Sequence, residues 1–234
     1  MENVIITGAT KGMGRAIAIA FAKQGLNIAV CSRNNEELLL LQDELKKINP
    51  GIRIIIRQTD ASRKEEVMAF AGLAEQELGF ISVIVNNVGI YEPSSILDDE
   101  DDTFTRLMNT NLMPSYELYR YFGKTMMASA RGHIFNICSV AALSPVVEAG
   151  MYSVTKSALL CLNNIMRLEM QTYGVKVTAI LPGSTLTDSW KGTDVNPDKF
   201  VSPDDIASAI ICAYNMSAGA NVDEIVIKPV TGQV

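Results

Sequence analysis

The chain of 234 residues is 48% hydrophobic and 20% charged, a composition typical of a globular protein with a sizeable core. Its net charge of −6 argues against a surface for nucleic acid or anionic membrane, because both need a basic patch. No apolar run approaches the roughly 18 residues of a membrane span, and the first predicted strand begins too early for a signal peptide. We therefore expect a cytoplasmic protein that forms one domain over residues 1–234.

Short apolar runs alternate with helical patterns along the whole chain. The predicted strands are Val4–Thr7, Asn27–Cys31, Ile52–Gln58, Ile81–Val85, Gly132–Cys138, Val175–Leu181 and Glu224–Lys228. The predicted helices are Arg15–Gln24, Glu36–Ile48, Ser62 to about Leu78, about Thr103–Ala130, about Tyr152–Thr172 and one that starts at Ser202 and Pro203. Ser62 is expected to cap its helix, with Glu65 completing a capping box. The alternation predicts an α/β fold, a doubly wound (Rossmann) parallel sheet of about seven strands with helices on both faces.

The four cysteines, Cys31, Cys138, Cys161 and Cys212, form no CxxC pair. We expect them to be buried, reduced thiols rather than disulfides or metal ligands. His133 is the single histidine, and we expect it to be structural. One histidine with scattered cysteines makes no ligand set, so no metal site is predicted.

A cluster of glycines, TGATKGMG at 7–14, follows the first predicted strand directly. Gly8 permits a tight turn, Gly12 lets backbone approach a ligand, and Gly14 allows helix and strand to pack closely. A pyrophosphate would rest on the N-terminus of the next helix, where free N–H groups favour an anion. The spacing is not that of a P-loop, because no Lys-Ser/Thr pair follows Gly12. The candidate cofactor contacts in this turn are Gly8, Thr10, Lys11, Gly12, Met13 and Gly14.

The end of the second predicted strand bears on the choice of dinucleotide. An acid there would accept hydrogen bonds from the ribose hydroxyls of NAD, and positions 31–34 contain none. Instead Ser32 and Arg33 stand there, with Lys11 nearby in the glycine turn. Two cations near the expected 2′-phosphate favour NADP(H), since arginine presents a planar fork to phosphate oxygens. The alternative is that both are solvated surface charges.

A hydroxyl, a phenol and an amine follow the fifth predicted strand, as Ser139, Tyr152 and Lys156. If Tyr152 lies in the first turn of a helix, Lys156 lies one turn further on the same face. A cation beside a phenol favours the phenolate, and Ser139 can donate a hydrogen bond to a substrate oxygen. This trio can protonate a carbonyl oxygen, or deprotonate an alcohol, while a cofactor moves a hydride.

These features together resemble the single-domain branch of the short-chain dehydrogenase/reductase family, over almost the whole chain. The resemblance is carried by TGATKGMG at 7–14, Asp60, NNVG at 86–89, Asn111, Ser139, Tyr152 with Lys156, and Pro182-Gly183 with Thr187. It implies that Asp60 meets the adenine amino group and that Asn111 holds a water for a proton relay through Lys156. It also implies that the segment after the sixth strand closes over the nicotinamide. The remaining cofactor contacts assigned on this basis are Ala61, Asn87, Gly89, Tyr152, Lys156, Pro182, Gly183, Thr185 and Thr187.

The chain departs from the family pattern in two places, and the second bears on the substrate. Val88 replaces the usual alanine of NNAG, and the ending DEIVIKPVTGQV lacks the glycine-rich segment of many members. The ending and the Ser32-Arg33-Asn34 turn are more similar to sepiapterin reductases and related carbonyl or hydroxy-acid oxidoreductases than to acyl-carrier-protein ketoreductases. A 3-oxoacyl or hydroxy-acid reductase stays open as the substrate type.

We therefore expect an NADP(H)-dependent oxidoreductase acting on a small carbonyl or alcohol, with Tyr152 as general acid and base. The alternative is a non-catalytic NADP-binding regulator. A substrate lid is expected at about 184–201, with Trp190 either capping the substrate or only fastening the lid, and Lys191 either meeting an anionic group or solvated. An apolar pocket wall is expected at Val140, Ala141, Ala142, Leu143, Val146, Val147 and Met151. The helices 103–130 and 152–172 are apolar over much of their circumference, and family members commonly pair through them, so a homodimer or homotetramer is expected.

Overall fold

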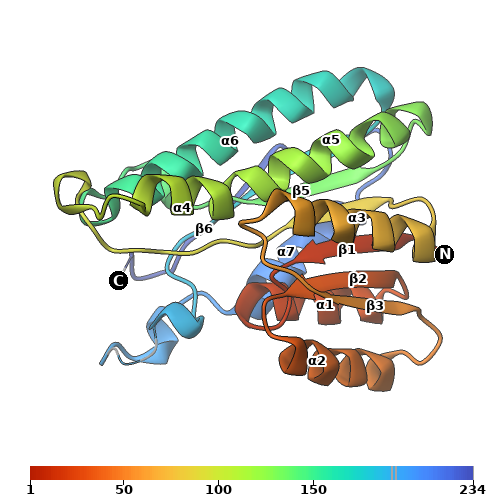
Figure 1. Cartoon of the computed structure of the whole chain (residues 1–234), viewed down its shortest axis with the longest axis horizontal. Coiled ribbons are helices and arrows are strands. Elements are labelled where there is room, and N and C mark those ends of the chain that lie inside the picture. Colours follow the sequence, from red (N-terminus) through yellow and green to blue (C-terminus); the bar gives the residue numbers. More distant parts are fainter. Residues whose placement is uncertain (191, 193, 234) are drawn as a thin grey trace.

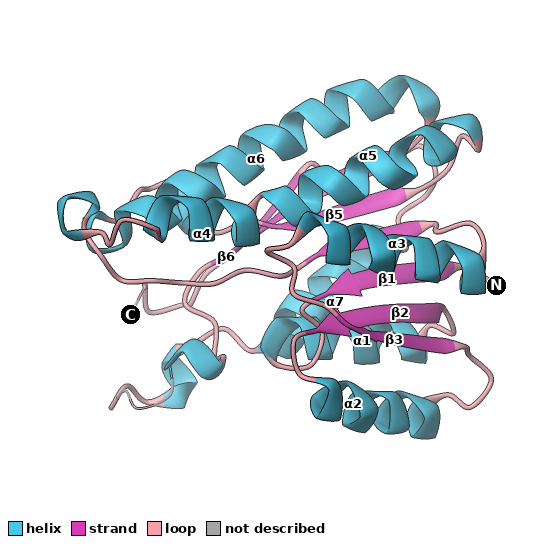
Figure 2. Cartoon of the chain, in the orientation of Figure 1, coloured by secondary structure: helices cyan, strands magenta, loops and turns pink. Residues whose placement is uncertain are grey.

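The structure, a computed structural model, describes residues 1–190, 192 and 194–233. Seven parallel strands form one sheet in the order β3-β2-β1-β4-β5-β6-β7. Figure 2 shows the part of this order from β3 through β2 to β1. The strands are β1 (Asn3–Thr7), β2 (Asn27–Ser32), β3 (Ile54–Gln58), β4 (Val83–Asn86), β5 (His133–Ile137), β6 (Lys176–Pro182) and β7 (Glu224–Ile227). The predicted doubly wound parallel sheet is confirmed.

Helices cover both faces of the sheet (Figure 1). The helices are α1 (Gly12–Lys23), α2 (Asn35–Ile48), α3 (Lys64–Leu78), α4 (Thr103–Asn111), α5 (Met113–Ala128), α6 (Gly150–Met170) and α7 (Pro203–Tyr214). Alternate residues of β1 point to opposite faces, so Val4 and Ile6 enter the core under α1, α2 and α7. Ile5 enters the core under α3, α5 and α6. Because both faces are covered, β1 is buried along its whole length, as a central parallel strand requires.

Strand β1 pairs with both β2 and β4, so the strand order changes direction at β1. After β3 the chain returns to the centre and continues outward in the other direction. In open parallel sheets such a switch point leaves a crevice beyond the carboxyl ends of the strands, where ligands bind. The C-terminal end of the chain lies on the same side as these strand ends (Figure 1).

One predicted helix is two. The expected helix over about Thr103–Ala130 is divided into α4 and α5 at Leu112. Pro114 stands in the first turn of α5, and without an N–H it cannot continue the hydrogen-bond ladder from α4. The break places Asn111 at the end of α4, where its side chain is buried.

The predicted cap of α3 is wrong. α3 begins at Lys64 with no side-chain cap, and Ser62 lies outside the helix. The Ser62 hydroxyl instead donates to Asp60 Oδ1 over 2.7 Å, and its backbone N–H donates to the same oxygen over 3.0 Å. The Ser62 side chain therefore bonds to Asp60 in a local turn, and it is not available to cap α3.

The burial of the cysteines is only partly as predicted. Cys31 and Cys138 are buried, whereas Cys161 and Cys212 are exposed on α6 and α7, and all four are free thiols. His133 is buried in β5, where its Nε2 lies 2.8 Å from Thr178 Oγ1. Among the helices in the described part of the chain, none is both long and apolar enough to span a membrane.

Smaller differences concern the ends of elements. α1 begins at Gly12 rather than Arg15, and α6 begins at Gly150, so Tyr152 lies in its first turn as predicted. β3 and β4 each begin two residues later than expected, at Ile54 and Val83. Shifts of this size are normal for sequence-based boundaries.

Candidate active site

The glycine turn joins β1 to α1 at the carboxyl end of the sheet. Gly8 has φ +66° and Gly12 has φ +50°, conformations that favour glycine. A Cβ on Gly14 would collide with the Gly8 carbonyl oxygen and the Asn87 amide, so helix and strand pack as closely as predicted. A Cβ on Gly12 would lie 3.0 Å from the Thr187 methyl group. Because glycines have no side chain, the backbone of this turn lies directly at the edge of the crevice.

The N-terminus of α1 is open to an anion. Lys11 precedes the helix in an extended conformation and provides no side-chain cap. The N–H groups of the first turn have no partner within the helix, and the helix dipole adds partial positive charge there. Together with the glycine turn, this arrangement fits the pyrophosphate of a dinucleotide.

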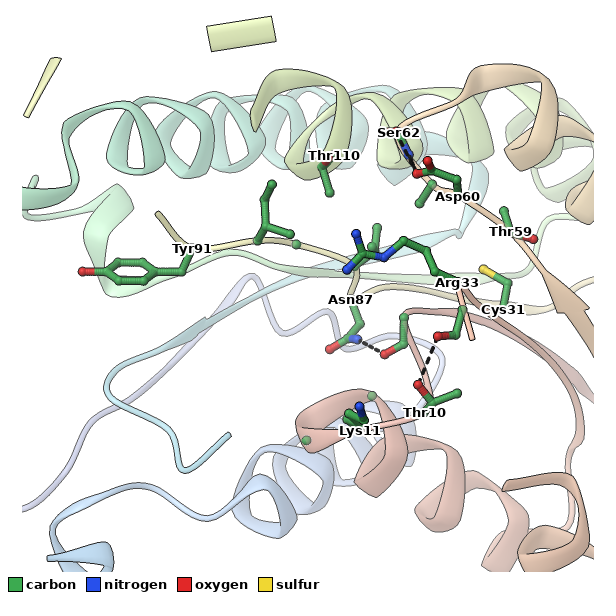
Figure 3. A pocket seen from close by; sticks show the side chains of 18 of the residues that line it. Thr10, Lys11, Cys31, Arg33, Thr59, Asp60, Ser62, Asn87, Tyr91 and Thr110 are labelled. Carbon is green, nitrogen blue, oxygen red and sulfur yellow. Dashed lines mark hydrogen bonds between the residues drawn. The ribbon is translucent and has the colours of Figure 1, made fainter. Parts of the chain in front are cut away.

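Asn87 ties the end of β4 to the end of β1. Its Nδ2 donates to the carbonyl oxygens of Thr7 (3.0 Å) and Gly8 (2.9 Å), and the latter contact is visible in Figure 3. The Thr7 hydroxyl in turn accepts from the N–H groups of Asn87 and Val88, at 3.0 and 3.1 Å. These bonds fix the glycine turn against the neighbouring strand.

A cavity of about 900 Å³ extends from this turn along the strand ends. Figure 3 shows Arg33 reaching into it between Asn87 and Thr110, with Tyr91 at the end opposite Thr59. The predicted cofactor contacts that line it are Gly8, Thr10, Lys11, Gly12, Met13, Gly14, Ser32, Arg33, Asp60, Ala61, Asn87, Gly89 and Thr187. The structure thus brings together the residues assigned to the adenosine and pyrophosphate parts of a dinucleotide, and adds Thr187 from the segment assigned to the nicotinamide.

Asp60 lies on the wall of this cavity close to Arg33. The two hydrogen bonds from Ser62, chiefly the one from its hydroxyl, hold the pKa of Asp60 below its usual value. The positive charge of Arg33 adds to this effect. Asp60 is therefore a fixed anion that can accept from an amino group.

Glu37 belongs to the site, although no pattern in the sequence predicts it. From the first turn of α2, its Oε1 lies 2.6 Å from Lys11 Nζ and its Oε2 accepts from Thr10 Oγ1 over 3.0 Å. Thr10 Oγ1 is also 3.1 Å from Ser32 Oγ. Hydrogen bonding and charge from Glu37 raise the pKa of Lys11, and the hydrogen bond from Lys11 lowers the pKa of Glu37. The sequence does not predict this contact, because Glu37 and the glycine turn come together only when the chain folds.

Tyr152 and Lys156 lie one turn apart on α6, as predicted. Lys156 is only 4% exposed, and its Nζ donates to the Ile137 carbonyl oxygen over 2.8 Å. It lies 5.8 Å from the centre of the Tyr152 ring. Burial lowers the pKa of Lys156 to about 8. Ser139 follows β5 and accepts from the Ala141 N–H over 3.1 Å.

The expected effect of Lys156 on the phenol is not the dominant one. Burial raises the pKa of Tyr152, and the Ser139 hydroxyl opposes part of that rise. The Lys156 ammonium donates to the Ile137 carbonyl and lies 5.8 Å from the centre of the Tyr152 ring. The structure therefore favours the protonated phenol, the form in which tyrosine is an acid.

Asn111 connects three segments around the lysine. Its Oδ1 accepts from the Ile90 N–H over 2.8 Å, and its Nδ2 donates to the Ile90 carbonyl and to Thr155 Oγ1, each over 3.0 Å. A Cβ on Gly89 would lie 3.3 Å from Lys156 Nζ and 3.4 Å from Asn111 Oδ1. The Asn111 amide and the Lys156 ammonium therefore both lie beside the Gly89 backbone.

Tyr91 was also not identified from the sequence. It lines the cavity, and its ring meets the Tyr152 ring edge-on with a centroid distance of 5.0 Å. Ser139, Asn111, Tyr152 and Lys156 are not among the lining residues. Tyr91 therefore lies between the cavity and Tyr152, and it contacts both.

Pro182, Gly183 and Thr185 do not line the cavity either. The carboxamide of Gln233 packs on Gly183, and its Oε1 accepts from the N–H and hydroxyl of Ser184 at 2.7 and 2.9 Å. Gln233 therefore covers the backbone at Gly183 and Ser184. In the expected lid, the Trp190 and Phe200 rings lie 4.9 Å apart, so the tryptophan packs within this segment. Lys191 lies outside the described residues.

The predicted apolar wall is not a wall of this cavity. Ala141 and Met151 are buried in the protein interior, whereas Leu143, Val146 and Val147 are exposed. Within residues 1–190, 192 and 194–233, no group of three or more His, Cys, Asp or Glu side chains is arranged to hold a metal ion.

Comparison with known proteins extends these observations. The sequence matches the family model for short chain dehydrogenases over residues 2–197. An uncharacterized oxidoreductase of Staphylococcus haemolyticus is 33% identical over 227 residues, which cover 97% of this chain and 96% of the relative. L-Sorbose reductase from Gluconobacter frateurii, solved with NADPH and L-sorbose, is similar with a TM-score of 0.90 at 25% identity, covering 97% of this chain and 95% of the reductase. A metagenomic short-chain oxidoreductase in complex with NADP gives a TM-score of 0.85 at 26% identity, with coverage of 98% and 97%.

Proposed function

Because this chain belongs to the short-chain dehydrogenase family, we propose that it is an NADP(H)-dependent oxidoreductase for a small carbonyl or alcohol substrate. The observation that carries the proposal is the grouping of Ser139, Tyr152 and Lys156 at the end of β5 and the start of α6. A regulator that only binds a dinucleotide has no need of a buried phenol beside a buried amine.

The cofactor proposal rests on the fit of the glycine turn, the α1 N-terminus and the cavity to a dinucleotide. In this proposal Asp60 and Ala61 hold the adenine, and Lys11, Ser32 and Arg33 hold the 2′-phosphate. When bound, the reduced nicotinamide supplies a hydride. Two of the similar structures contain NADPH or NADP, which supports the phosphorylated form. The remaining proposed contacts, at the nicotinamide end, are Pro182, Gly183, Thr185 and Thr187. Thr187 already lines the cavity, and Gln233 has to move away to uncover Gly183.

In the direction of reduction, Tyr152 donates its proton to the carbonyl oxygen of the substrate. Burial raises the pKa of its phenol, so the proton is present at neutral pH. Ser139 donates a hydrogen bond to the same oxygen and holds it near the phenol. Such general-acid assistance contributes about 10²–10⁴-fold to the rate.

Lys156 and Asn111 resupply the proton. The pKa of Lys156, lowered to about 8, is close enough to neutral for the side chain to give up and regain a proton during turnover. Lys156 and Asn111 both lie beside the Gly89 backbone, and in this proposal a water between them carries the proton. In the oxidation of an alcohol, Tyr152 acts as the base and the path runs in reverse.

The substrate class is proposed as a small carbonyl compound of the sepiapterin, hydroxy-acid or 3-oxoacyl type. The segment 184–201 would close over it, with Tyr91 as the aromatic wall next to Tyr152. We would follow the loss of reduced nicotinamide absorbance with a panel of pterins, diketones, quinones, β-keto esters and ketose sugars, including L-sorbose. Consumption of NADPH with at least one carbonyl supports the proposal. Tight NADPH binding without consumption by any member would instead favour the regulator.

We also propose an even-numbered homo-oligomer that pairs through α6. The apolar side chains of Val154, Ile165 and Leu168 on this helix are 44%, 48% and 56% exposed, and a partner would bury them. The mass in solution tests this point, since a 25.5 kDa species at micromolar concentration would contradict it.

A further inference from the structure

Glu37 places a negative charge inside the site proposed for the 2′-phosphate. Its carboxylate contacts Lys11 at 2.6 Å and Thr10 at 3.0 Å, and its side chain is 26% exposed. Lys11 is one of the two cations on which the preference for NADP(H) rests. In this structure that cation is already paired.

A second hollow, of about 680 Å³, lies beside the main cavity and is lined by both cations. Its walls are Thr10, Lys11, Ser32, Arg33, Gln58 and the 34–37 segment that starts α2. The Asn34 side chain accepts from the N–H groups of Glu36 and Glu37, at 2.9 and 3.2 Å. Since Asn34 already uses those N–H groups, a phosphate in this hollow depends on the side chains of Lys11, Arg33 and Ser32.

We propose that Glu37 sets the balance between NADP(H) and NAD(H), an inference that rests on the function proposed above. A phosphate oxygen bound to Lys11 would lie about 2.8 Å from Nζ, which places it no more than about 5.4 Å from Glu37 Oε1. Repulsion between the carboxylate and a phosphate of charge about −1.5 to −2 weakens binding of the phosphorylated dinucleotide.

The same carboxylate has the opposite effect on NAD(H). A ribose 2′-hydroxyl carries no charge and can donate a hydrogen bond to Glu37, as the Thr10 hydroxyl already does. Glu37 therefore reduces the preference for NADP(H) over NAD(H) that Lys11 and Arg33 create.

The test is binding, measured without turnover. Glu37→Gln removes the charge but keeps an oxygen that can accept from Thr10, so the fold is preserved. Glu44→Gln is the matched control: it lies two turns further along α2, pairs with Arg15, and lines neither hollow. Fluorescence titration gives the Kd values of NADPH and NADH for the three proteins, and calorimetry gives those of 2′,5′-ADP and 5′-ADP.

In Glu37→Gln we expect the ratio of the NADH Kd to the NADPH Kd to rise about tenfold, equivalent to about 1.4 kcal/mol. The same change should appear between 5′-ADP and 2′,5′-ADP, and Glu44→Gln should change neither ratio. An unchanged or smaller ratio in Glu37→Gln overturns the inference while leaving the oxidoreductase proposal intact. If the wild-type protein binds neither dinucleotide, both the inference and the proposed function are wrong.

Discussion

Replacing Asn111 with alanine tests whether the end of α4 holds the catalytic candidates in place. The side chain is 1% exposed and makes three hydrogen bonds, two to the Ile90 backbone and one to Thr155. Alanine leaves the Ile90 N–H and carbonyl without these partners. Each buried polar group so orphaned costs about 1–3 kcal/mol, and Ile90 is only partly buried, so water recovers some of this loss. We expect a loss of about 2–4 kcal/mol in the free energy of unfolding.

Urea denaturation of Asn111→Ala at neutral pH measures this loss, with Asn109→Ala as the control on the same helix. Asn109 is partly exposed, so its replacement should change stability by less than about 0.5 kcal/mol. Turnover of Asn111→Ala should also fall, because Thr155 lies one residue before Lys156 and bonds the Tyr152 carbonyl over 2.8 Å. If Asn111→Ala were as stable as wild type, the described hydrogen bonds would not be what joins α4, Ile90 and α6.

Two further predictions concern stability and the glycine turn. Burial, and to a smaller degree the charge of Lys176, lowers the pKa of His133 to about 3, below the unfolded value of about 6.5. Between pH 6.5 and 3 the unfolded chain therefore binds a proton that the folded chain does not, so stability falls with decreasing pH, by about 2 kcal/mol at pH 5. Urea titrations at pH 8 and pH 5 should show this fall. In His133→Gln the part of the fall that comes from His133 should be absent. Gly14→Ala should cost about 1–3 kcal/mol and weaken NADPH binding, because its Cβ would collide with the Gly8 carbonyl. Gly219→Ala, where nothing lies within 4 Å of the added Cβ, is the control, and equal behaviour of the two variants would contradict the packing account.

The sequence predicts the layered fold well because its signals are local. Each strand is a short apolar run, and the helices between them show where crossovers occur. The position of Tyr152 in the first turn of α6 follows from the same reasoning. The division of α4 from α5 was also readable in principle, because Pro114 lacks the N–H that a continuous helix needs.

The features that the sequence did not predict depend on contacts between distant segments. Glu37 meets Lys11, and Gln233 meets Ser184, only after the sheet brings their elements together. Ser62 fits the pattern of a helix cap, but in the structure its hydroxyl donates to the Asp60 carboxylate two residues earlier. Exposure of Cys161 could not be read from its apolar surroundings, because α6 carries apolar side chains on its outer face as well.

The central claim is that Tyr152 supplies the proton in a redox reaction, and the variant Tyr152→Phe tests it most directly. The two measurements are the Kd of NADPH by fluorescence and kcat with any carbonyl that the panel identifies. We predict an NADPH Kd within about twofold of wild type and a kcat lower by about 10²-fold or more. A kcat close to wild type in the phenylalanine variant would contradict the account.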